Sequence, residues 1–124
     1  MTHWKYFTEK ELADTRTGEC YMDEAFMVKL DKLRDLYGTP MRITSGYRSK
    51  ETNLAVGGAE NSPHMHGKAV DVYVSGAAAL NLIRLALEVG FTGIGVSQKG
   101  QSRFIHIDTM DNSPSQPRPT IWSY

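Results

Sequence analysis

Hydrophobic residues recur at helical spacing in two stretches of the chain, residues 24–37 and 76–89, and a glycine follows each stretch. Weaker signals predict two short helices as well, the second of which ends at the pair Gly57-Gly58. Each of the four helices follows a residue whose side chain can cap a helix N-terminus. These capping residues are Thr8, Asp23, Ser49 and Ser75.

Four short segments have the composition or the alternation of β-strands. In the second segment, alternation places Asp71 on the side opposite the three valines. The last two segments are separated by a short turn, which predicts an antiparallel hairpin. The predicted strands are Met41–Ser45, Lys68–Val74, Gly93–Ser97 and Ser102–Thr109. Helices around such strands indicate an α+β fold, with a short, mostly antiparallel sheet flanked by helices.

The end of the chain differs in composition from the rest. Residues 112–120 hold three prolines among serine and glutamine, which excludes a helix or a central strand. The segment closes on Ile121, Trp122 and Tyr124, large residues that we expect to be buried. We therefore expect residues 110–124 to form an extended strap over the domain.

Length and charge limit the classes of protein that the chain can represent. Its 124 residues are enough for one domain with its own core. The 14 basic and 14 acidic residues give a formal net charge of zero, which opposes nucleic acid as a partner because proteins that bind phosphates carry a basic excess. No stretch is long and apolar enough to span a membrane. We expect a monomeric single domain with neither nucleic acid nor membrane as its partner.

Residues able to bind a metal are concentrated in two segments, residues 62–71 and 104–108. One histidine from the loop before Asp71, Asp71 itself and His106 can converge on one ion, because they come from a loop and two neighbouring strands. Two imidazoles and one carboxylate leave a fourth position for water, which is typical of catalytic zinc. A structural zinc site usually has four protein ligands, often cysteines, and this chain has one cysteine, Cys20.

The same segments resemble a known family. Ser-x-His-x-x-Gly-x-Ala-x-Asp, from Ser62 to Asp71, is followed by His-x-Asp at His106 and Asp108, a pattern similar to that of the M15 zinc peptidases. These enzymes are peptidoglycan-cleaving D-Ala-D-Ala carboxypeptidases and endopeptidases. Two upstream segments also resemble the family in the right order, so that the resemblance runs from about residue 45 to residue 109, and the tryptophan-containing end of the chain is similar as well. The upstream segments are Ser45–Ser49 and Asn53–Ala59.

The resemblance implies a role for five residues of this chain. It makes His64, Asp71 and His106 the ligands of one Zn2+ ion. Arg48 matches an arginine that lines the substrate site, and its planar guanidinium can bind a carboxylate or carbonyl of a stem peptide. Ser62 matches a serine that braces the loop or bonds substrate. The implied substrate is a peptide of peptidoglycan, and trimming of terminal D-Ala and cleavage of crosslinks both remain open.

One position departs from the family pattern. Several M15 branches carry a general-base glutamate three residues before the last histidine ligand, and this chain has Arg103 there. An arginine does not accept a proton near neutral pH. Asp108 and His66 are the candidate general bases instead, and Asp108 has the alternative role of orienting an imidazole. The departure also allows a second function, a metal-binding recognition module of the same fold with reduced catalysis.

The resemblance sets the expected organisation of the chain. Residues 1–44 hold the N-terminal helices and first strand, residues 45–109 the metal and substrate site, and residues 110–124 the strap. Residues 1–7 lack the basic-then-apolar form of a secretion signal. A chain without a leader is made in the cytoplasm, which suits a phage lysis or tail-associated enzyme, or one exported by a partner.

Overall fold

The computed structural model describes residues 4–124, so the first three of the seven residues considered for a secretion signal lie outside the described part. Helices and strands follow the predicted order, with one additional 3-10 helix and one additional strand. The helices are α1 (Glu9–Leu12), α2 (Glu24–Tyr37), α3 (Lys50–Ala55), the 3-10 helix η1 (Pro63–His66) and α4 (Gly76–Val89). The strands are β1 (Arg42–Ser45), β2 (Ala69–Tyr73), β3 (Gly93–Ser97), β4 (Phe104–Asp108) and β5 (Thr120–Ser123).

The four predicted capping residues precede the four α-helices. The side chains of Thr8, Asp23 and Ser49 each accept a hydrogen bond from a backbone N–H in the first turn, which satisfies a group that the helix itself leaves unpaired. Ser75 stands at the N-cap of α4 without such a bond. Helix α3 is shorter than predicted, because it ends at Ala55 and not at the glycine pair.

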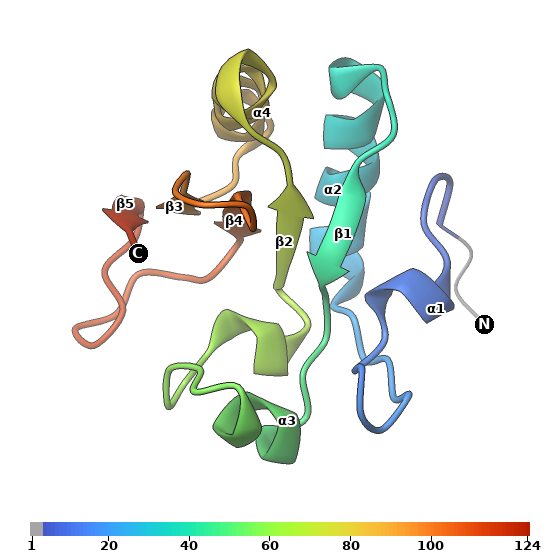
Figure 1. Ribbon diagram of the computed structural model, residues 1–124, viewed down its shortest axis with the longest axis vertical. Helices are drawn as coiled ribbons and strands as arrows, with labels where there is room; N and C mark the ends of the chain where they lie inside the picture. The colour runs from blue at the N-terminus through green and yellow to red at the C-terminus, as the bar shows by residue number, and fades with distance from the viewer. Residues whose placement is uncertain (1–3) are drawn as a thin grey trace.

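The five strands form one sheet with the order β1-β2-β4-β3-β5 (Figure 1). Strands β1 and β2, β2 and β4, and β3 and β4 pair antiparallel, while β5 pairs parallel with β3. The β3–β4 pair confirms the predicted hairpin. The small, mostly antiparallel sheet with helices around it confirms the α+β fold.

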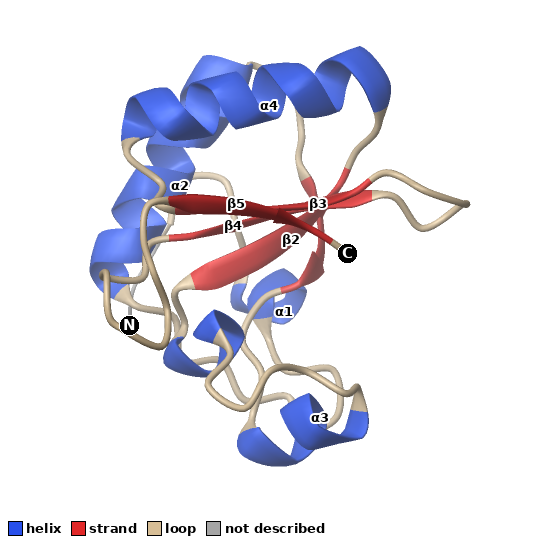
Figure 2. Ribbon diagram, turned by 90° about the vertical axis from the view of Figure 1, so that its left-hand side faces the viewer, coloured by secondary structure: helices blue, strands red, loops and turns tan. Residues whose placement is uncertain are grey.

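Helices α2 and α4 pack together over one face of the sheet, and α1, α3 and η1 lie toward the other (Figure 2). Alternation assigns each strand residue to a face. Val70 and Val72 of β2 and Ile105 and Ile107 of β4 are buried in the core beneath the two long helices. Asp71 and His106 therefore lie on the opposite face. Within the described part of the chain, no helix is both long and apolar enough to cross a bilayer.

The C-terminal segment differs from its prediction in two respects. Residues 120–123 are extended as expected, but they add a fifth strand to the sheet beside β3. The side chains of Ile121 and Tyr124 are 64% and 55% exposed, so the expectation that these residues are buried is wrong. The two side chains are exposed because only one face of an edge strand packs against the protein. The additional strand was not predicted because a short proline-rich segment gives no local signal for pairing with a distant strand.

Candidate metal centre

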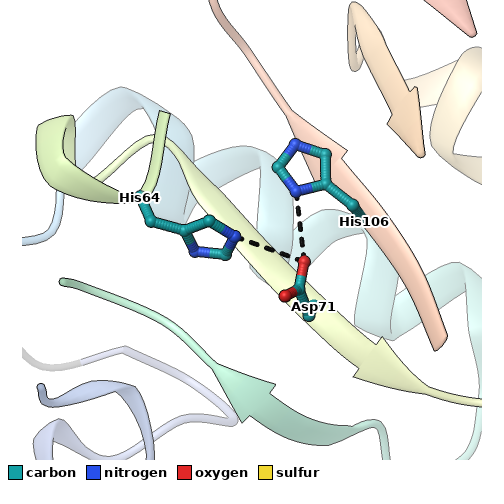
Figure 3. A group of neighbouring side chains, drawn as sticks. All are labelled: His64, Asp71 and His106. Carbon is teal, nitrogen blue, oxygen red and sulfur yellow. Dashed lines mark hydrogen bonds and ion pairs between the residues drawn. The ribbon is translucent and has the colours of Figure 1, made fainter. Parts of the chain in front are cut away.

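Asp71 and His106 are direct partners across the β2–β4 pair, which places their side chains next to each other on one face of the sheet. His64 reaches the same point from η1 (Figure 3). Oδ1 of Asp71 lies 3.1 Å from Nδ1 of His106 and 3.3 Å from Nε2 of His64. The three residues are buried, and one potential ligand atom from each lies within 4.8 Å of the others. The structure thus brings together the three predicted ligands.

Local sequence explains how η1 presents His64. The Ser62 side chain accepts a hydrogen bond from the backbone N–H of His64, and Pro63 occupies the first turn, where its missing N–H costs nothing. The helix ends at Gly67, whose φ of 67° is a left-handed conformation that favours glycine. The chain then turns directly into β2. The predicted polar loop therefore contains a short rigid element immediately before the strand that carries Asp71.

The ring of His64 is fixed by a hydrogen bond on the side away from Asp71. Its Nδ1 lies 2.8 Å from the backbone carbonyl oxygen of Gly46. A carbonyl only accepts, so Nδ1 carries the proton and Nε2 keeps the lone pair that a metal requires. Gly46 follows β1, so the edge strand of the sheet determines which nitrogen of His64 faces the site.

The ring of His106 is held in a corresponding way by a carboxylate. Nε2 of His106 lies 2.7 Å from Oδ2 of Asp108, which leaves Nδ1 facing Asp71. Arg118 donates to both oxygens of Asp108, at 3.0 Å from Nε and 2.8 Å from Nη2. Asp108 is fully buried. Carboxylate and carbonyl partners of this kind orient metal-binding histidines, so the surroundings of both imidazoles fit a bound metal.

The electrostatics keep the carboxylates of the site charged. Burial raises the pKa of Asp71, but hydrogen bonds and charge from His106 and His64 outweigh burial and hold that pKa well below its ordinary value. Burial likewise raises the pKa of Asp108, but His106 and Arg118 hold it below its ordinary value. Burial lowers the pKa of His106, and the two carboxylates raise it by more. Both aspartates are therefore ionised at neutral pH, as a metal ligand and its supporting acceptor must be.

Arg48 borders the centre from the side of β1. Its Nη2 lies 3.6 Å from Oδ2 of Asp71, while Nε donates to Ser45 and Nη1 to Asn53.

A buried carboxylate anchors the backbone next to Arg48. The residue after Arg48, Ser49, donates its backbone N–H to the carboxylate of Asp14 at 2.6 Å. Asp14 thereby links the segment after α1 to the start of α3. These contacts hold the guanidinium beside the three predicted ligands, within reach of a ligand in the cleft.

The predicted metal ligands open onto a cleft of about 560 Å³. Arg48 and the loop after α3 line the cleft, and the C-terminal segment lines it as well. Ser62 also lines the cleft, but its side chain is buried and caps η1. The residues that the C-terminal segment contributes are Gln116, Arg118, Trp122 and Tyr124. The cleft can therefore hold a substrate directly above the three ligands.

The two candidate general bases lie away from the lining of this cleft. Both oxygens of Asp108 accept hydrogen bonds from Arg118, and Oδ2 also faces His106, contacts that fit the alternative in which Asp108 orients an imidazole. His66 is exposed, and its Nε2 lies 2.8 Å from Oδ1 of Asn61. Arg103, at the glutamate position of other branches, is exposed in the β3–β4 hairpin and donates to the carbonyl of Gly100.

Sequence reasoning missed Arg118 and the two glycines of β3 that make room for the site. A Cβ on Gly93 would collide with the carboxylate of Asp108. A Cβ on Gly95 would lie 2.8 Å from Nε1 of Trp122 and 3.0 Å from Cβ of His106. Glycine in the interior of a strand marks a close approach, so the Gly93-x-Gly95 spacing was the available signal. Arg118 lies in the proline-rich segment, where no periodicity indicates its direction.

An α+β domain with two oriented imidazoles and one carboxylate at the base of a cleft has the form of a metal-dependent hydrolase. Comparison with protein families agrees: the model of the family described as peptidase M15 matches residues 5–108. The chain belongs to the peptidase M15 family. This confirms the resemblance seen in the sequence. The match ends at Asp108, so residues 109–124 lie beyond it.

Several relatives of this chain have names that describe peptidoglycan endopeptidases or a D-Ala-D-Ala carboxypeptidase. The chain is 36% identical over 95 residues to the peptidoglycan L,D-endopeptidase MepK of Escherichia coli strain K12, covering 71% of this chain and 51% of that protein. It is 36% identical over 83 residues to the zinc D-Ala-D-Ala carboxypeptidase of Streptomyces albus G, covering 65% of this chain and 32% of that protein. The probable peptidoglycan L,D-endopeptidase MepK of Haemophilus influenzae is 30% identical over 107 residues, covering 79% of this chain and 56% of that protein. The chain spans about half the length of the MepK proteins it matches.

Proposed function

We propose that this protein is a zinc-dependent peptidase that hydrolyses peptide bonds in the stem peptides or crosslinks of peptidoglycan, acting as a monomer. The observation that carries the proposal is the convergence of Nε2 of His64, Nδ1 of His106 and a carboxylate oxygen of Asp71 beneath an open cleft. Family membership supports the reaction class, and the names of the relatives support the substrate.

His64, Asp71 and His106 would hold one Zn2+ ion. These residues supply two imidazole nitrogens and one carboxylate oxygen. Such a set of donors suits zinc and leaves a coordination position for water. Zinc bound at such a site acts as a Lewis acid toward a carbonyl and lowers the pKa of its water. Gly46 and Asp108 would keep the two imidazoles in the orientation that presents the required nitrogens.

Arg48 would bind and orient the substrate. Its guanidinium is tethered by Ser45 and Asn53, so little side-chain freedom would be lost on binding a peptide carboxylate or carbonyl. Ser62 would brace the loop, because its hydroxyl is already engaged with the backbone of His64. Asp108 would act as a positioning residue for His106. His66 would have to turn away from Asn61 to serve as a base.

The test combines metal analysis with digestion of isolated peptidoglycan sacculi. The purified protein should contain about one zinc per chain and release peptides, and a chelator should abolish this release. His64→Ala should lose both zinc and activity, whereas the matched control His66→Ala should keep its zinc. Released free D-Ala would identify a carboxypeptidase, and conversion of crosslinked muropeptides into monomers would identify an endopeptidase.

The outcomes separate the enzyme from its alternative. One equivalent of zinc without release of any product from sacculi or from soluble muropeptides would contradict the peptidase and favour a metal-binding recognition module. Two observations support that alternative: the carboxylate of Asp108 is already hydrogen-bonded to Arg118, and His66 is exposed beside Asn61, so neither candidate base faces the cleft. A protein that binds no zinc would contradict both.

A further inference from the structure

One wall of the cleft is formed by the part of the chain that lies outside the family match. Residues 109–124 follow the matched region and return along β3, with β5 parallel to it. Gly95 of β3 pairs with His106 on one side and with Trp122 on the other. Because strand side chains alternate, Trp122 and Tyr124 point to the same face of the sheet as His106. The rings of Trp122 and His106 are 5.1 Å apart.

Most polar side chains in this cleft already have a partner within the protein. Arg118 donates to Asp108, and Nε2 of Gln116 donates to the carbonyl of Asn61 at 2.7 Å. The hydroxyl of Ser62 accepts from the backbone of His64. His64, Asp71 and His106 are committed to the metal under the proposed function. Among the residues that line the cleft, Tyr124 is the one hydroxyl group that remains accessible to a substrate.

The position of Tyr124 is well defined even though its side chain is half exposed. Its backbone N–H donates to the carbonyl of Val96 at 3.1 Å, which continues the pairing of β5 with β3. Its ring packs against Phe104, with 5.1 Å between ring centroids, and lies 6.5 Å from the ring of Trp122. The ring is thus supported from two sides, and its accessible edge borders the cleft.

The surroundings keep the Tyr124 hydroxyl protonated. Burial and the charges of Asp71 and Asp108 raise the pKa of Tyr124. A hydrogen bond with Trp122 and the charge of Arg48 lower it by less, so that the pKa lies above its ordinary value. The indole N–H of Trp122 can only donate, so the tyrosine oxygen is the acceptor of that bond. The hydroxyl proton is then free to be donated elsewhere.

We propose that the Tyr124 hydroxyl donates a hydrogen bond to the carbonyl oxygen of the scissile peptide as that oxygen gains negative charge. This inference rests on the proposed peptidase function. The substrate would lie in the cleft that Arg48 and Tyr124 both line, beside the three proposed metal ligands that share it with them. A neutral donor aimed at a developing oxyanion favours the transition state over the substrate, which is the condition for raising kcat.

The test is Tyr124→Phe, which removes the hydroxyl and keeps the ring that packs on Phe104. The matched control is Tyr37→Phe, because Tyr37 ends α2 on the opposite side of the sheet. Both variants and the unmodified protein are loaded with zinc and assayed on soluble crosslinked muropeptides and on stem peptides ending in D-Ala-D-Ala. Zinc content is measured for each. Loss of one oxyanion donor commonly lowers kcat by about 10²–10³-fold, and we expect Tyr124→Phe to reach the lower end of this range with KM and zinc content unchanged.

Each result decides the matter. If the unmodified protein is active and Tyr124→Phe has the same kcat, Tyr124 is not a catalytic residue. If Tyr124→Phe raises KM at constant kcat, the tyrosine only binds substrate, and the proposal is again overturned. If the unmodified protein carries zinc but cleaves neither substrate, the proposed function itself has failed and the role of Tyr124 falls with it.

Discussion

Arg118 and Asp108 form a buried ion pair in which the guanidinium donates to both carboxylate oxygens, at 3.0 and 2.8 Å. The Arg118 side chain is 7% exposed and that of Asp108 is fully buried. Bidentate pairs of this kind fix the plane of the carboxylate as well as its charge. Since Asp108 in turn faces Nε2 of His106, the C-terminal segment supports the orientation of a predicted zinc ligand through Asp108.

This arrangement predicts that Arg118→Ala weakens zinc binding. Without the two Arg118 donors, the buried carboxylate of Asp108 would keep only the backbone N–H of Met110 on Oδ1 and would be held less firmly against His106. Loss of such supporting partners commonly costs about 10- to 100-fold in metal affinity. Removal of one partner of a buried ion pair also lowers the free energy of unfolding by about 3–5 kcal/mol. Zinc affinity is measured by competition with a chromophoric chelator, and stability by urea denaturation of the metal-free protein.

Arg103→Ala is the matched control for Arg118→Ala, because Arg103 is an exposed arginine of the β3–β4 hairpin. It should leave zinc affinity unchanged. Arg118→Lys should recover part of the affinity, since an ammonium replaces the charge but not the two parallel hydrogen bonds. Zinc binding by Arg118→Ala as tight as that of the unmodified protein would show that Asp108 holds its position unaided.

The predicted ligands were accessible from the sequence because strand alternation is a local property. A period of two assigns Asp71 and His106 to the face away from the core without any knowledge of which strands pair. The hairpin and the helix caps are local in the same sense. The pairing of β2 with β4, which makes Asp71 and His106 direct neighbours, depends on contacts between distant residues, and the family resemblance supplied that part of the argument.

The C-terminal segment could not be placed in this way. Its prolines indicate an extended chain. Its pairing with β3 depends on the absence of side chains at Gly93 and Gly95, because a Cβ there would collide with Asp108 or Trp122. Arg118 has no periodic neighbours that would identify it as a buried residue. Ile121 and Tyr124 were expected to be buried on hydrophobicity alone, and an edge strand leaves such side chains exposed.

Arg48 provides a prediction about substrate binding. Arg48→Lys keeps the charge beside Asp71 but loses the planar fork that Ser45 and Asn53 hold in place. A hydrogen bond to a charged group is worth about 1.5–3 kcal/mol, so we expect kcat/KM to fall by about 10- to 100-fold, chiefly through a higher KM. The measurement is steady-state cleavage of soluble muropeptides by the zinc-loaded protein.

The control for this prediction is Arg42→Lys, at the start of β1. Arg42 is exposed and lies over the ring of Tyr73, 5.1 Å from its centroid, so its charge serves no group in the cleft. This variant should keep the kinetics of the unmodified protein. An unchanged kcat/KM in Arg48→Lys would contradict the assignment of Arg48 to substrate binding.

Asp14 provides a prediction about the pH dependence of stability. Its buried carboxylate accepts hydrogen bonds from the backbone N–H groups of Arg16, Thr17 and Ser49 and from the hydroxyl of Thr52. Burial raises the pKa of Asp14, but these four donors outweigh burial and hold the pKa well below its ordinary value. A lowered pKa in the folded state means that the ionised group stabilises the fold above the unfolded-state pKa of about 3.9, and that this stabilisation is lost as pH falls toward the folded-state pKa.

We therefore expect Asp14→Asn to lower the free energy of unfolding at pH 7 by about 1.5–3 kcal/mol, because the amide nitrogen would face a backbone donor at a site built for two acceptors. The difference between the variant and the unmodified protein should shrink as pH falls below about 4, where the unmodified protein loses the same contribution. Urea denaturation at pH 7 and at pH 3, with a chelator present, measures both values. Asp111→Asn, in an exposed loop, corrects for the general effect of removing a carboxylate. A stability difference that stays constant between the two pH values would mean that the Asp14 carboxylate does not stabilise the fold through its charge.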